Sequence, residues 1–501
     1  MRKLFLLLSL FILSLNSWAK FCSDPNLETL PSFSEGRMQP LIVHASKSLK
    51  QIFGKNPCPS FNQIETYCLL STGRSEEIKN NSNCKLTTLV KHHELLTMLG
   101  RVESEIDIFE ALNFKQALIE KYNFLEESKN EDSSLAQAIG TLLNKLALFE
   151  QIRAGDDWKF LNQNHTWKSI NTSNPNEILA SKSNTTADES KRLDLEYNYQ
   201  KYSIFALAIF LSILGFIFSL LSARTENKFF SKLTIFFFST SLMAELCAMI
   251  MRTLISGRSP ITNMYETVML TGAGGLLLAG ILHFALKNKH LLPIGFTINL
   301  VCLFMMRFST EMLDGEIKPL VPVLRDNFWL STHVTTITLS YACFALAWFV
   351  TNYVLARFIF KSTDFNQTLE TWNKALRIIL QVGVVFLAAG ILLGGIWADY
   401  SWGRFWGWDP KETWSLISLI IYVIILHGKY ANWFKDVLFT IVTNAAFMFI
   451  LMTWFGVNYV LSAGLHSYGS STGGTSFLIS IFIFETAILT LSLLRWKNLK
   501  T

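Results

Sequence analysis

The sequence predicts an all-α polytopic membrane protein, with about nine transmembrane helices preceded by a signal peptide and a mainly helical extracytoplasmic head domain. Half of its 501 residues are hydrophobic and only 16% are charged, whereas soluble chains average about a quarter charged. Apolar runs of about 20 residues, the length that crosses a bilayer, fill the region 201–495. The basic excess lies largely in short loops between these runs, so the net charge of +6 predicts a lipid bilayer and no nucleic acid as partner.

The first nineteen residues, 1–19, have the three parts of a secretory signal peptide. Arg2 and Lys3 form the charged region, an apolar core follows, and Ala19 supplies a small residue before the cleavage point. An uncleaved anchor helix is the alternative. Both interpretations place residue 20 onward outside the cytoplasm.

Residues 20–164 form the expected extracytoplasmic head domain, and apolar residues three and four apart predict that it is mostly helical. Four cysteines in an exported segment suit two disulfides, although spacing does not determine the pairing. These cysteines are Cys22, Cys58, Cys68 and Cys84. Residues 165–200 are rich in Asn, Ser and Thr without an apolar period, so we expect a linker there.

The transmembrane domain is expected at 201–495, followed by a cytoplasmic tail at 496–501. Its apolar runs lie at 202–222, 230–251, 265–286, 291–307, 334–356, 376–396, 414–428, 437–460 and 476–494. With the head outside, the loops predicted to be inside hold twice as many Lys and Arg as those outside, which is the bias that orients membrane helices. The run at 414–428 is short, and its helix is expected to extend into the flanking residues.

A tryptophan-rich segment, WGRFWGWDPKETW at 402–414, lies in the outer loop between the sixth and seventh runs. Indoles offer large flat apolar faces, so several together suit a large planar ligand. Interfacial anchoring explains one or two tryptophans at a membrane boundary, but not a group of this density. Pro410 suits the first turn of the seventh helix and Asp409 its N-cap. The clustered tryptophans are Trp397, Trp402, Trp406, Trp408 and Trp414.

Two histidines are predicted on the same membrane face as this segment, His333 at the start of the fifth run and His466 after the eighth. Neutral imidazoles bind haem iron axially, so the pair predicts a bis-histidine haem site beside the tryptophans. His427, at the inner end of the seventh run, fits a second haem position near the inner face, with His283 as a candidate partner. The plainer explanation for each histidine is a polar residue at a helix end.

The tryptophan segment resembles the WWD motif of haem-handling proteins in cytochrome c maturation. Its continuation Asp-Pro-Lys-Glu-Thr-Trp is similar to the CcsA (ResC) family, the membrane component of the system II cytochrome c synthase. Three further stretches agree in order: GRSPITNMYE (257–266), HVTTITLSYACFALA (333–347) and GLHSYG (464–469). The resemblance covers roughly 200–495, and EGRMQPLIVHASKSLKQIFGK (35–55) is loosely similar to a segment of longer members.

The resemblance implies that haem b is exported across the bacterial inner membrane and presented on the periplasmic side. There it is joined by thioether bonds to the Cys-x-x-Cys-His sequence of apocytochrome c. The resemblance assigns His333 and His466 as outer iron ligands and His427 as an inner ligand. The platform maps onto Trp402, Trp406, Trp408 and Asp409, with Trp414 close by.

One departure from the family concerns the second inner histidine, which fused members carry in a CcsB-like portion. A separate CcsB-like membrane subunit or His283 would supply it here, and a thiol-reducing pathway is a further expected partner. Haem propionates need cations, and the outer candidates are Arg258, Arg325 and Arg404. Two other functions stay open, a haem-delivery transporter that serves a separate chaperone and a cytochrome b-type electron-transfer subunit.

Overall fold

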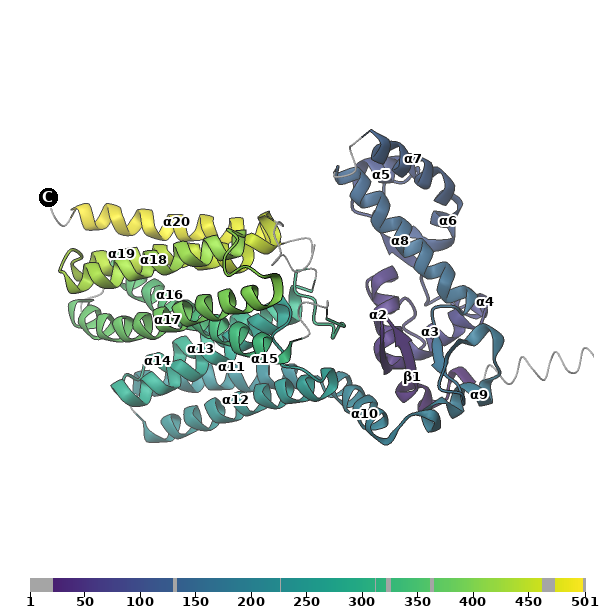
Figure 1. Ribbon diagram of the computed structural model, residues 1–501, viewed down its shortest axis with the longest axis horizontal. Coiled ribbons are helices and arrows are strands. Elements are labelled where there is room, and N and C mark those ends of the chain that lie inside the picture. Colours follow the sequence, from purple (N-terminus) through teal and green to yellow (C-terminus); the bar gives the residue numbers. More distant parts are fainter. Residues whose placement is uncertain are drawn as a thin grey trace, which may run out of the picture. The chain divides into compact units, whose positions relative to one another are not determined.

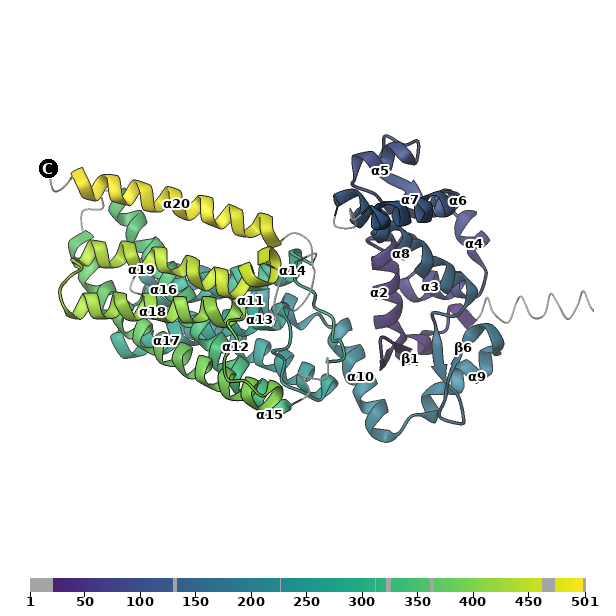
Figure 2. The same ribbon diagram turned by 45° about the horizontal axis from the view of Figure 1, so that its top comes forward.

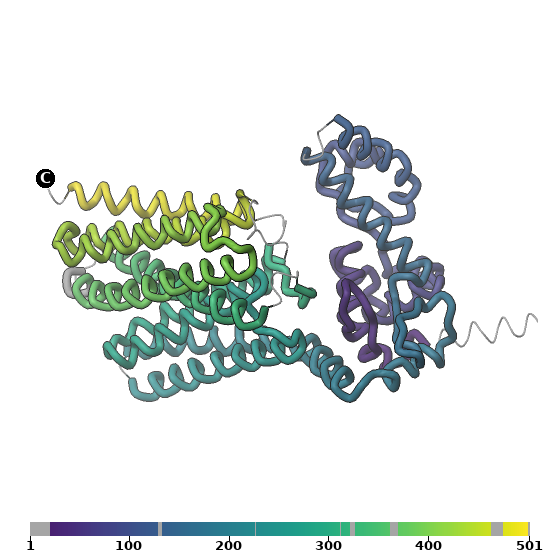
Figure 3. Tube along the Cα trace, in the orientation of Figure 1, coloured from purple at the N-terminus to yellow at the C-terminus, as the bar shows by residue number. Residues whose placement is uncertain are grey.

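The computed structural model describes residues 21–128, 133–225, 227–310, 312–320, 326–360, 365–461 and 474–498. The chain forms two compact units, Met1–Tyr202 and Ser203–Thr501, and Figure 3 traces the backbone of each. The expected signal peptide at 1–19 lies outside the described residues.

The first unit is mainly helical and also contains short strands that the sequence analysis did not predict. Its helices are α2 (Leu41–Phe53), α3 (Gln63–Ser71), α4 (Ser75–Lys79), α5 (His93–Met98), α6 (Ile108–Asn113), α7 (Lys115–Glu127), α8 (Ser134–Ala154), α9 (Pro175–Leu179) and α10 (Ala187–Lys201), with the 3-10 turns η1 (Pro25–Thr29), η2 (Ile170–Thr172) and η3 (Ala180–Asn184). The strands β1 (Pro31–Ser34), β2 (Arg37–Pro40), β5 (Lys159–Leu161) and β6 (Trp167–Ser169) form an antiparallel sheet in the order β2-β1-β5-β6, and β3 (Thr87–Leu89) pairs with β4 (Glu105–Asp107).

Two disulfides cross-link the core of this unit. They join Cys22 to Cys68 and Cys58 to Cys84. The first ties the start of the described chain to α3, and the second closes the loop that contains α3 and α4. Four cysteines therefore form two bridges as expected, and the structure supplies the pairing that spacing left open.

The segment 165–200, expected as a linker, is folded into the first unit. It carries β6, η2, α9, η3 and α10, and Ile170 and Ile178 are buried in the core. Arg37 on β2 donates two hydrogen bonds, of 2.9 and 2.7 Å, to the carboxylate of Glu196 on α10. The isolated apolar residues among the Asn and Ser therefore complete the core of the first unit. They are too widely spaced to give a recognisable helical or strand pattern in the sequence.

The second unit is a bundle of long apolar helices that run alongside one another (Figures 1 and 2). They are α11 (Ile204–Thr225), α12 (Lys228–Ser256), α13 (Met264–Leu286), α14 (Leu291–Phe308), α16 (Thr335–Ile359), α17 (Phe365–Trp402), α18 (Pro410–Tyr430), α19 (Asp436–Leu451) and α20 (Gly474–Asn498). Within the described ranges nine helices are long and apolar enough to cross a membrane, as predicted. The chain is a multi-pass membrane protein.

Helix α16 lies at the centre of this bundle and packs against α13, α14, α17, α19 and α20. Its Phe344 is fully buried and stacks on Tyr422 of α18 with ring centroids 3.9 Å apart. The short helix α15 (Asn327–Trp329) leads into α16 through a π-helical turn, η5 (Leu330–Val334). A second π-helix, η6 (Met452–Leu461), continues α19. Both π-helices supply lining residues of one pocket. Short π-helical turns are frequent at functional sites.

Candidate functional site

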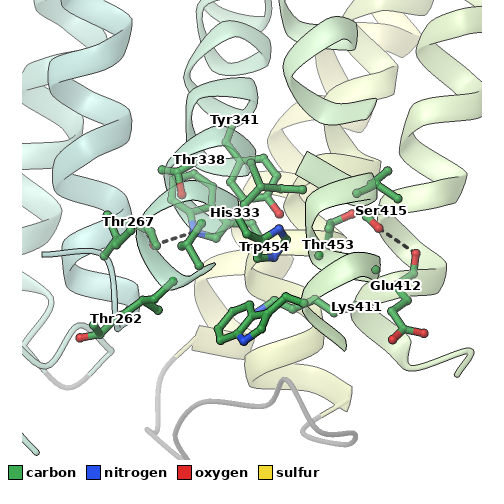
Figure 4. A pocket seen from close by; sticks show the side chains of 18 of the residues that line it. Thr262, Thr267, His333, Thr338, Tyr341, Lys411, Glu412, Ser415, Thr453 and Trp454 are labelled. Carbon is green, nitrogen blue, oxygen red and sulfur yellow. Dashed lines mark hydrogen bonds between the residues drawn. The ribbon is translucent and has the colours of Figure 1, made fainter. Parts of the chain in front are cut away.

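A pocket opens among the start of α13, the start of α16, the end of α17 and the start of α18. It holds about 1020 Å³ of empty space when its open mouth is counted. Figure 4 shows His333 on one of its walls, with Trp454, Lys411 and Glu412 around it. Most of the wall is apolar or aromatic, including Ile261, Val334, Ile337, Trp397, Trp406 and Trp454. Such a wall with few polar groups is typical of small-molecule sites.

His333 is half-buried in the π-turn η5 and lines this pocket. Its Nδ1 lies 2.8 Å from the carbonyl oxygen of Gly390 on α17. A carbonyl accepts only, so Nδ1 carries the proton and Nε2 carries the lone pair. This is the tautomer that binds a metal, with the second nitrogen oriented by a backbone oxygen. The ring also meets Trp397 edge-on, with centroids 5.9 Å apart.

The imidazole has room because α17 carries a glycine beside it. A Cβ placed on Gly394 would lie 2.6 Å from His333 Cε1, closer than real side chains approach. The next residue, Gly395, would similarly meet the ring of Phe405 at 2.6 Å. The two glycines thus let a histidine and a phenylalanine lie directly against the helix backbone, on the border of the pocket.

The tryptophans of 402–414 divide into those at the pocket and those away from it. Trp406 lines the pocket and meets Trp408 edge-on, with centroids 5.9 Å apart. Trp408 is 70% exposed and has a φ of 57°. Of the predicted platform, Trp402, Trp408 and Trp414 are not among the described lining residues. The tryptophans that the structure brings to the pocket with Trp406 are Trp397 and Trp454.

Asp409 is the N-cap of α18, as the sequence predicted. Its Oδ1 accepts a hydrogen bond of 2.9 Å from the backbone N–H of Lys411. Glu412 Oε2 in turn accepts from the N–H groups of Asp409, at 3.1 Å, and Gly407, at 2.8 Å. This reciprocal capping, with Pro410 at the first helical position, fixes the loop that carries Trp406 to the start of the helix.

The stretch GRSPITNMYE forms the pocket wall at the start of α13. Glu266 pairs with Arg252 of α12 at 2.6 Å, and the two side chains are only 4% and 1% exposed. The other oxygen of Glu266 accepts from the N–H and the hydroxyl of Thr262, at 2.7 and 2.8 Å. Ser259 is 2.5 Å from Ser331, in the π-turn of His333. A buried ion pair therefore holds the wall that adjoins this histidine.

Two of the predicted histidines, His427 and His283, are not among the described residues that line this pocket. His427 is exposed near the C-terminal end of α18, where its Nδ1 lies 3.1 Å from the Val423 carbonyl oxygen. His283 lies in the last turn of α13, and its Nδ1 is 2.9 Å from the carbonyl oxygen of Asn288. His466 and the candidate cation Arg325 lie outside the described residues.

Thr267, Tyr341 and Trp454 are among the lining residues that were not predicted from the sequence. Trp454 Nε1 donates to Thr267 Oγ1 at 3.0 Å, and its indole stacks on Tyr341 with centroids 5.4 Å apart. Tyr341 follows His333 by two helical turns, as Ile337 does by one, so helical spacing alone was a usable signal for it. The sequence gave no such signal for Trp454, because its position at the pocket depends on how α19 and its continuation η6 pack against the other helices.

Comparison with known proteins gives consistent matches. The family model described as Cytochrome C assembly protein matches residues 261–466. Protein NrfI of Wolinella succinogenes is 35% identical over 301 residues, which are 58% of this chain and 32% of NrfI, so the chain spans about a third of that relative. Cytochrome c biogenesis protein CcsA of Guillardia theta is 30% identical over 291 residues, covering 52% of this chain and 93% of CcsA.

CcsA of Chlorella vulgaris is 30% identical over 270 residues, which cover 46% of this chain and 84% of that protein. The match to the solved structure of Cytochrome c Heme Lyase CcmF covers 58% of this chain and 50% of that chain, with 16% identity and a TM-score of 0.43. Since the CcsA sequences match over most of their own length, this chain belongs to the CcsA family of cytochrome c biogenesis proteins.

Proposed function

We propose that this chain moves haem b across a bacterial inner membrane and holds it at the periplasmic face for attachment to apocytochrome c. The observation that carries the proposal is His333, half-buried in an apolar and aromatic pocket with its Nδ1 hydrogen-bonded to Gly390. That bond puts the lone pair on Nε2, the nitrogen that would bind iron. Trp397 and Trp406 supply flat apolar surface for a porphyrin.

The proposed outer ligand set is His333 with His466, although His466 lies outside the described residues. During attachment, the histidine of the apocytochrome Cys-x-x-Cys-His sequence would replace one of them. Each cysteine S–H then adds across a haem vinyl group, forming one S–C and one C–H bond, so nothing is released and no oxidant is consumed. The contribution of this chain is to hold the haem in position, because the nucleophiles belong to the substrate.

A second haem position near the cytoplasmic face would use His427. Its exposed place on α18 suits a ligand shared with a second helix, supplied by a CcsB-like subunit or by His283. A thiol-reducing pathway would keep the apocytochrome cysteines ready for addition. Both partners are part of the proposal.

The ligand assignment is tested by the absorption spectrum of the purified full-length protein. We expect His333→Ala and His466→Ala each to lose the bis-histidine haem spectrum and cytochrome c assembly, and added imidazole to restore both in part. His93→Ala, which removes an exposed histidine from the first unit, is the matched control. Normal spectra and assembly in both variants would refute the ligand assignment.

The reaction is tested by co-expression with an apocytochrome c in a host that lacks cytochrome maturation genes. We expect covalent haem on the apocytochrome, with a CcsB-like subunit added where needed. Haem-loaded protein that forms no covalent product would instead support the haem-delivery transporter. A reversible redox response to quinol without apocytochrome would support the electron-transfer alternative.

The inner position gives a separate prediction. His427→Ala removes an exposed side chain, so it leaves the fold intact, yet we expect less haem in the purified protein because the entry ligand is lost. Haem content per protein, measured as the pyridine haemochrome, is the readout. A haem content equal to that of the unmodified protein would remove His427 from the route.

A further inference from the structure

The end of the pocket that lies away from the loops carries two hydroxyl groups on α16. Thr338 and Tyr341 line the pocket with His333 and follow it along the same helical segment by five and eight residues (Figure 4). We propose that these two hydroxyls hydrogen-bond a carboxyl group of the pocket's ligand. This inference rests on the proposed function, under which the ligand is haem and the carboxyl group is a propionate.

The described part of the chain leaves both hydroxyls without a hydrogen-bond partner. Thr338 is fully buried, and its Oγ1 makes no hydrogen bond to the described residues. Tyr341 is only 5% exposed; its ring stacks on Trp454, but its hydroxyl makes no hydrogen bond within the described ranges. A buried hydroxyl without a partner is costly, so a ligand atom that satisfies it gains affinity.

The phenol of Tyr341 extends back toward His333. Side chains of an α-helix lean toward its N-terminal end, and long ones cover the preceding turn. Eight residues of helix separate the two backbone positions by about 12 Å along the axis, and the length of the phenol shortens this separation. A flat macrocycle bound at His333 can therefore bring a side group on its edge to the Tyr341 hydroxyl.

Two neighbouring hydroxyls are suited to a carboxyl group. Each can donate one hydrogen bond and also accept, so the pair complements a protonated carboxyl group without placing a net charge against an apolar wall. Haem b has oxygen atoms only in its two propionates, so a propionate is the group that could accept from Tyr341. The described charged residues of the lining, Lys411 and Glu412, belong to a different helix, α18.

The arginines expected to bind propionates make contacts elsewhere. Arg258 donates to the carbonyl oxygen of Lys318 at 2.6 Å and to Thr262 Oγ1 at 3.3 Å. Arg404 lies over the Trp402 ring, 5.9 Å from its centroid. Neither is among the described residues that line the pocket, so recognition of a carboxyl group inside it falls to other side chains.

A carboxyl group held at Thr338 and Tyr341 would also orient the macrocycle. The two propionates of haem lie on one edge of the porphyrin, and the vinyl groups lie away from that edge. With the propionate edge directed along α16, the vinyl groups would face the loops at the helix starts. The two hydroxyls would thus leave the reactive edge where a protein substrate can approach.

The test uses two iron porphyrins that differ only in their carboxyl groups. Mesohaem carries two propionates, and aetiohaem has ethyl groups in their place. The affinity of the purified full-length protein is measured for both, and the ratio is compared between variants. We expect Tyr341→Phe and Thr338→Val each to lower the affinity for mesohaem relative to aetiohaem by about fivefold to tenfold, the scale of one hydrogen bond.

Tyr422→Phe is the matched control. Tyr422 also has a buried hydroxyl without a partner among the described residues, but it is not among those that line the pocket, so the ratio should stay unchanged. Retained binding of aetiohaem in Tyr341→Phe shows that the pocket of this variant is folded.

The outcomes separate this inference from the proposed function. An unchanged ratio in Tyr341→Phe or in Thr338→Val would overturn the inference. An equal loss of affinity for both porphyrins would also overturn it, because the hydroxyl would then support the fold and not the carboxyl group. The absence of a His333-dependent spectrum with either porphyrin would instead refute the proposed function.

Discussion

The imidazole of His333 is positioned by one hydrogen bond and by one absent side chain. Gly390 accepts from Nδ1 at 2.8 Å, and Gly394, one turn further along α17, leaves the space that the ring occupies. Both contacts come from the same helix. Two residues of α17, Gly390 and Gly394, therefore control whether the proposed iron ligand can take its place.

Gly394→Ala should displace this ring while leaving the bundle folded. The new Cβ would lie 2.6 Å from His333 Cε1 and 3.0 Å from Nδ1, so the imidazole must rotate and its bond to Gly390 must lengthen. We expect several-fold less bound haem, measured by absorption per protein. In Gly274→Ala, the matched control on α13, the nearest atom is Ala342 Cβ at 3.2 Å, and haem content should stay normal. Equal haem in both variants would contradict the role of Gly394.

At this scale the sequence identified His333 and Trp406 as candidates because their chemistry is unusual beside apolar helices. It did not identify the tautomer, which depends on a carbonyl 57 residues away. Nor did it separate Trp406, which lines the pocket, from Trp402 and Trp408, which do not. That separation depends on the turn between α17 and α18, where Trp408 has a positive φ.

A buried ion pair joins the last turns of α12 to the start of α13, beside the pocket. Arg252 of α12 holds Glu266 of α13 and also donates to the carbonyl oxygen of Gly315 at 2.9 Å. Glu266 holds Thr262, which lines the pocket. One ion pair thus fixes three segments that are separate in the sequence.

Removing one partner of this pair should cost far more than removing both. Glu266→Ala leaves a buried guanidinium without its carboxylate, so we expect the free energy of unfolding to fall by about 3–5 kcal/mol. Combining Arg252→Met with Glu266→Leu should recover most of this loss, measured by equilibrium unfolding in detergent. Asp314→Ala breaks the exposed pair with Lys318 and should cost about 0–1 kcal/mol. Similar losses in Glu266→Ala and Asp314→Ala would contradict a special role for the buried pair.

Long elements were predictable, and irregular ones were not. Apolar length revealed every span from α11 to α20, and Pro410 with Asp409 revealed the start of α18. The π-helices η5 and η6 were not predicted, because a π-turn differs from an α-turn by hydrogen-bond register and carries no apolar period of its own. They matter here because both deliver residues to the pocket.

At the scale of the whole molecule, the first unit is stabilised by its own cluster of hydrogen bonds, which centres on the carboxylate of Asp157. Its Oδ2 is bonded by His44 Nε2 at 2.8 Å, by Tyr67 OH at 2.6 Å and by Ser48 Oγ at 3.3 Å. Burial opposes ionisation of Asp157, but these hydrogen bonds outweigh burial and lower its pKa. The cluster joins α2 and α3 to the chain that follows α8.

This lowered pKa predicts how the first unit responds to acid. A carboxyl with a depressed folded pKa contributes stability that is present above its unfolded pKa, about 3.9, and lost as the pH falls through the folded value. Asp157→Asn should therefore speed pepsin cleavage within residues 21–202 of the full-length chain at about pH 5, and the difference from the unmodified protein should shrink toward about pH 3. Asp188→Asn, at an exposed carboxyl, is the control. A difference that does not change with pH would rule out this linkage.

Helix α18 is 21 residues long and carries pocket residues in its first turns and His427 in its last turn. Such a rod advances 1.5 Å and turns about 100° per residue. Inserting one amino acid between Ser415 and His427 would swing the imidazole by more than a quarter of a revolution while leaving Lys411 and Glu412 where they are. The number of residues between the pocket and His427 therefore fixes the direction in which this imidazole points from the helix axis.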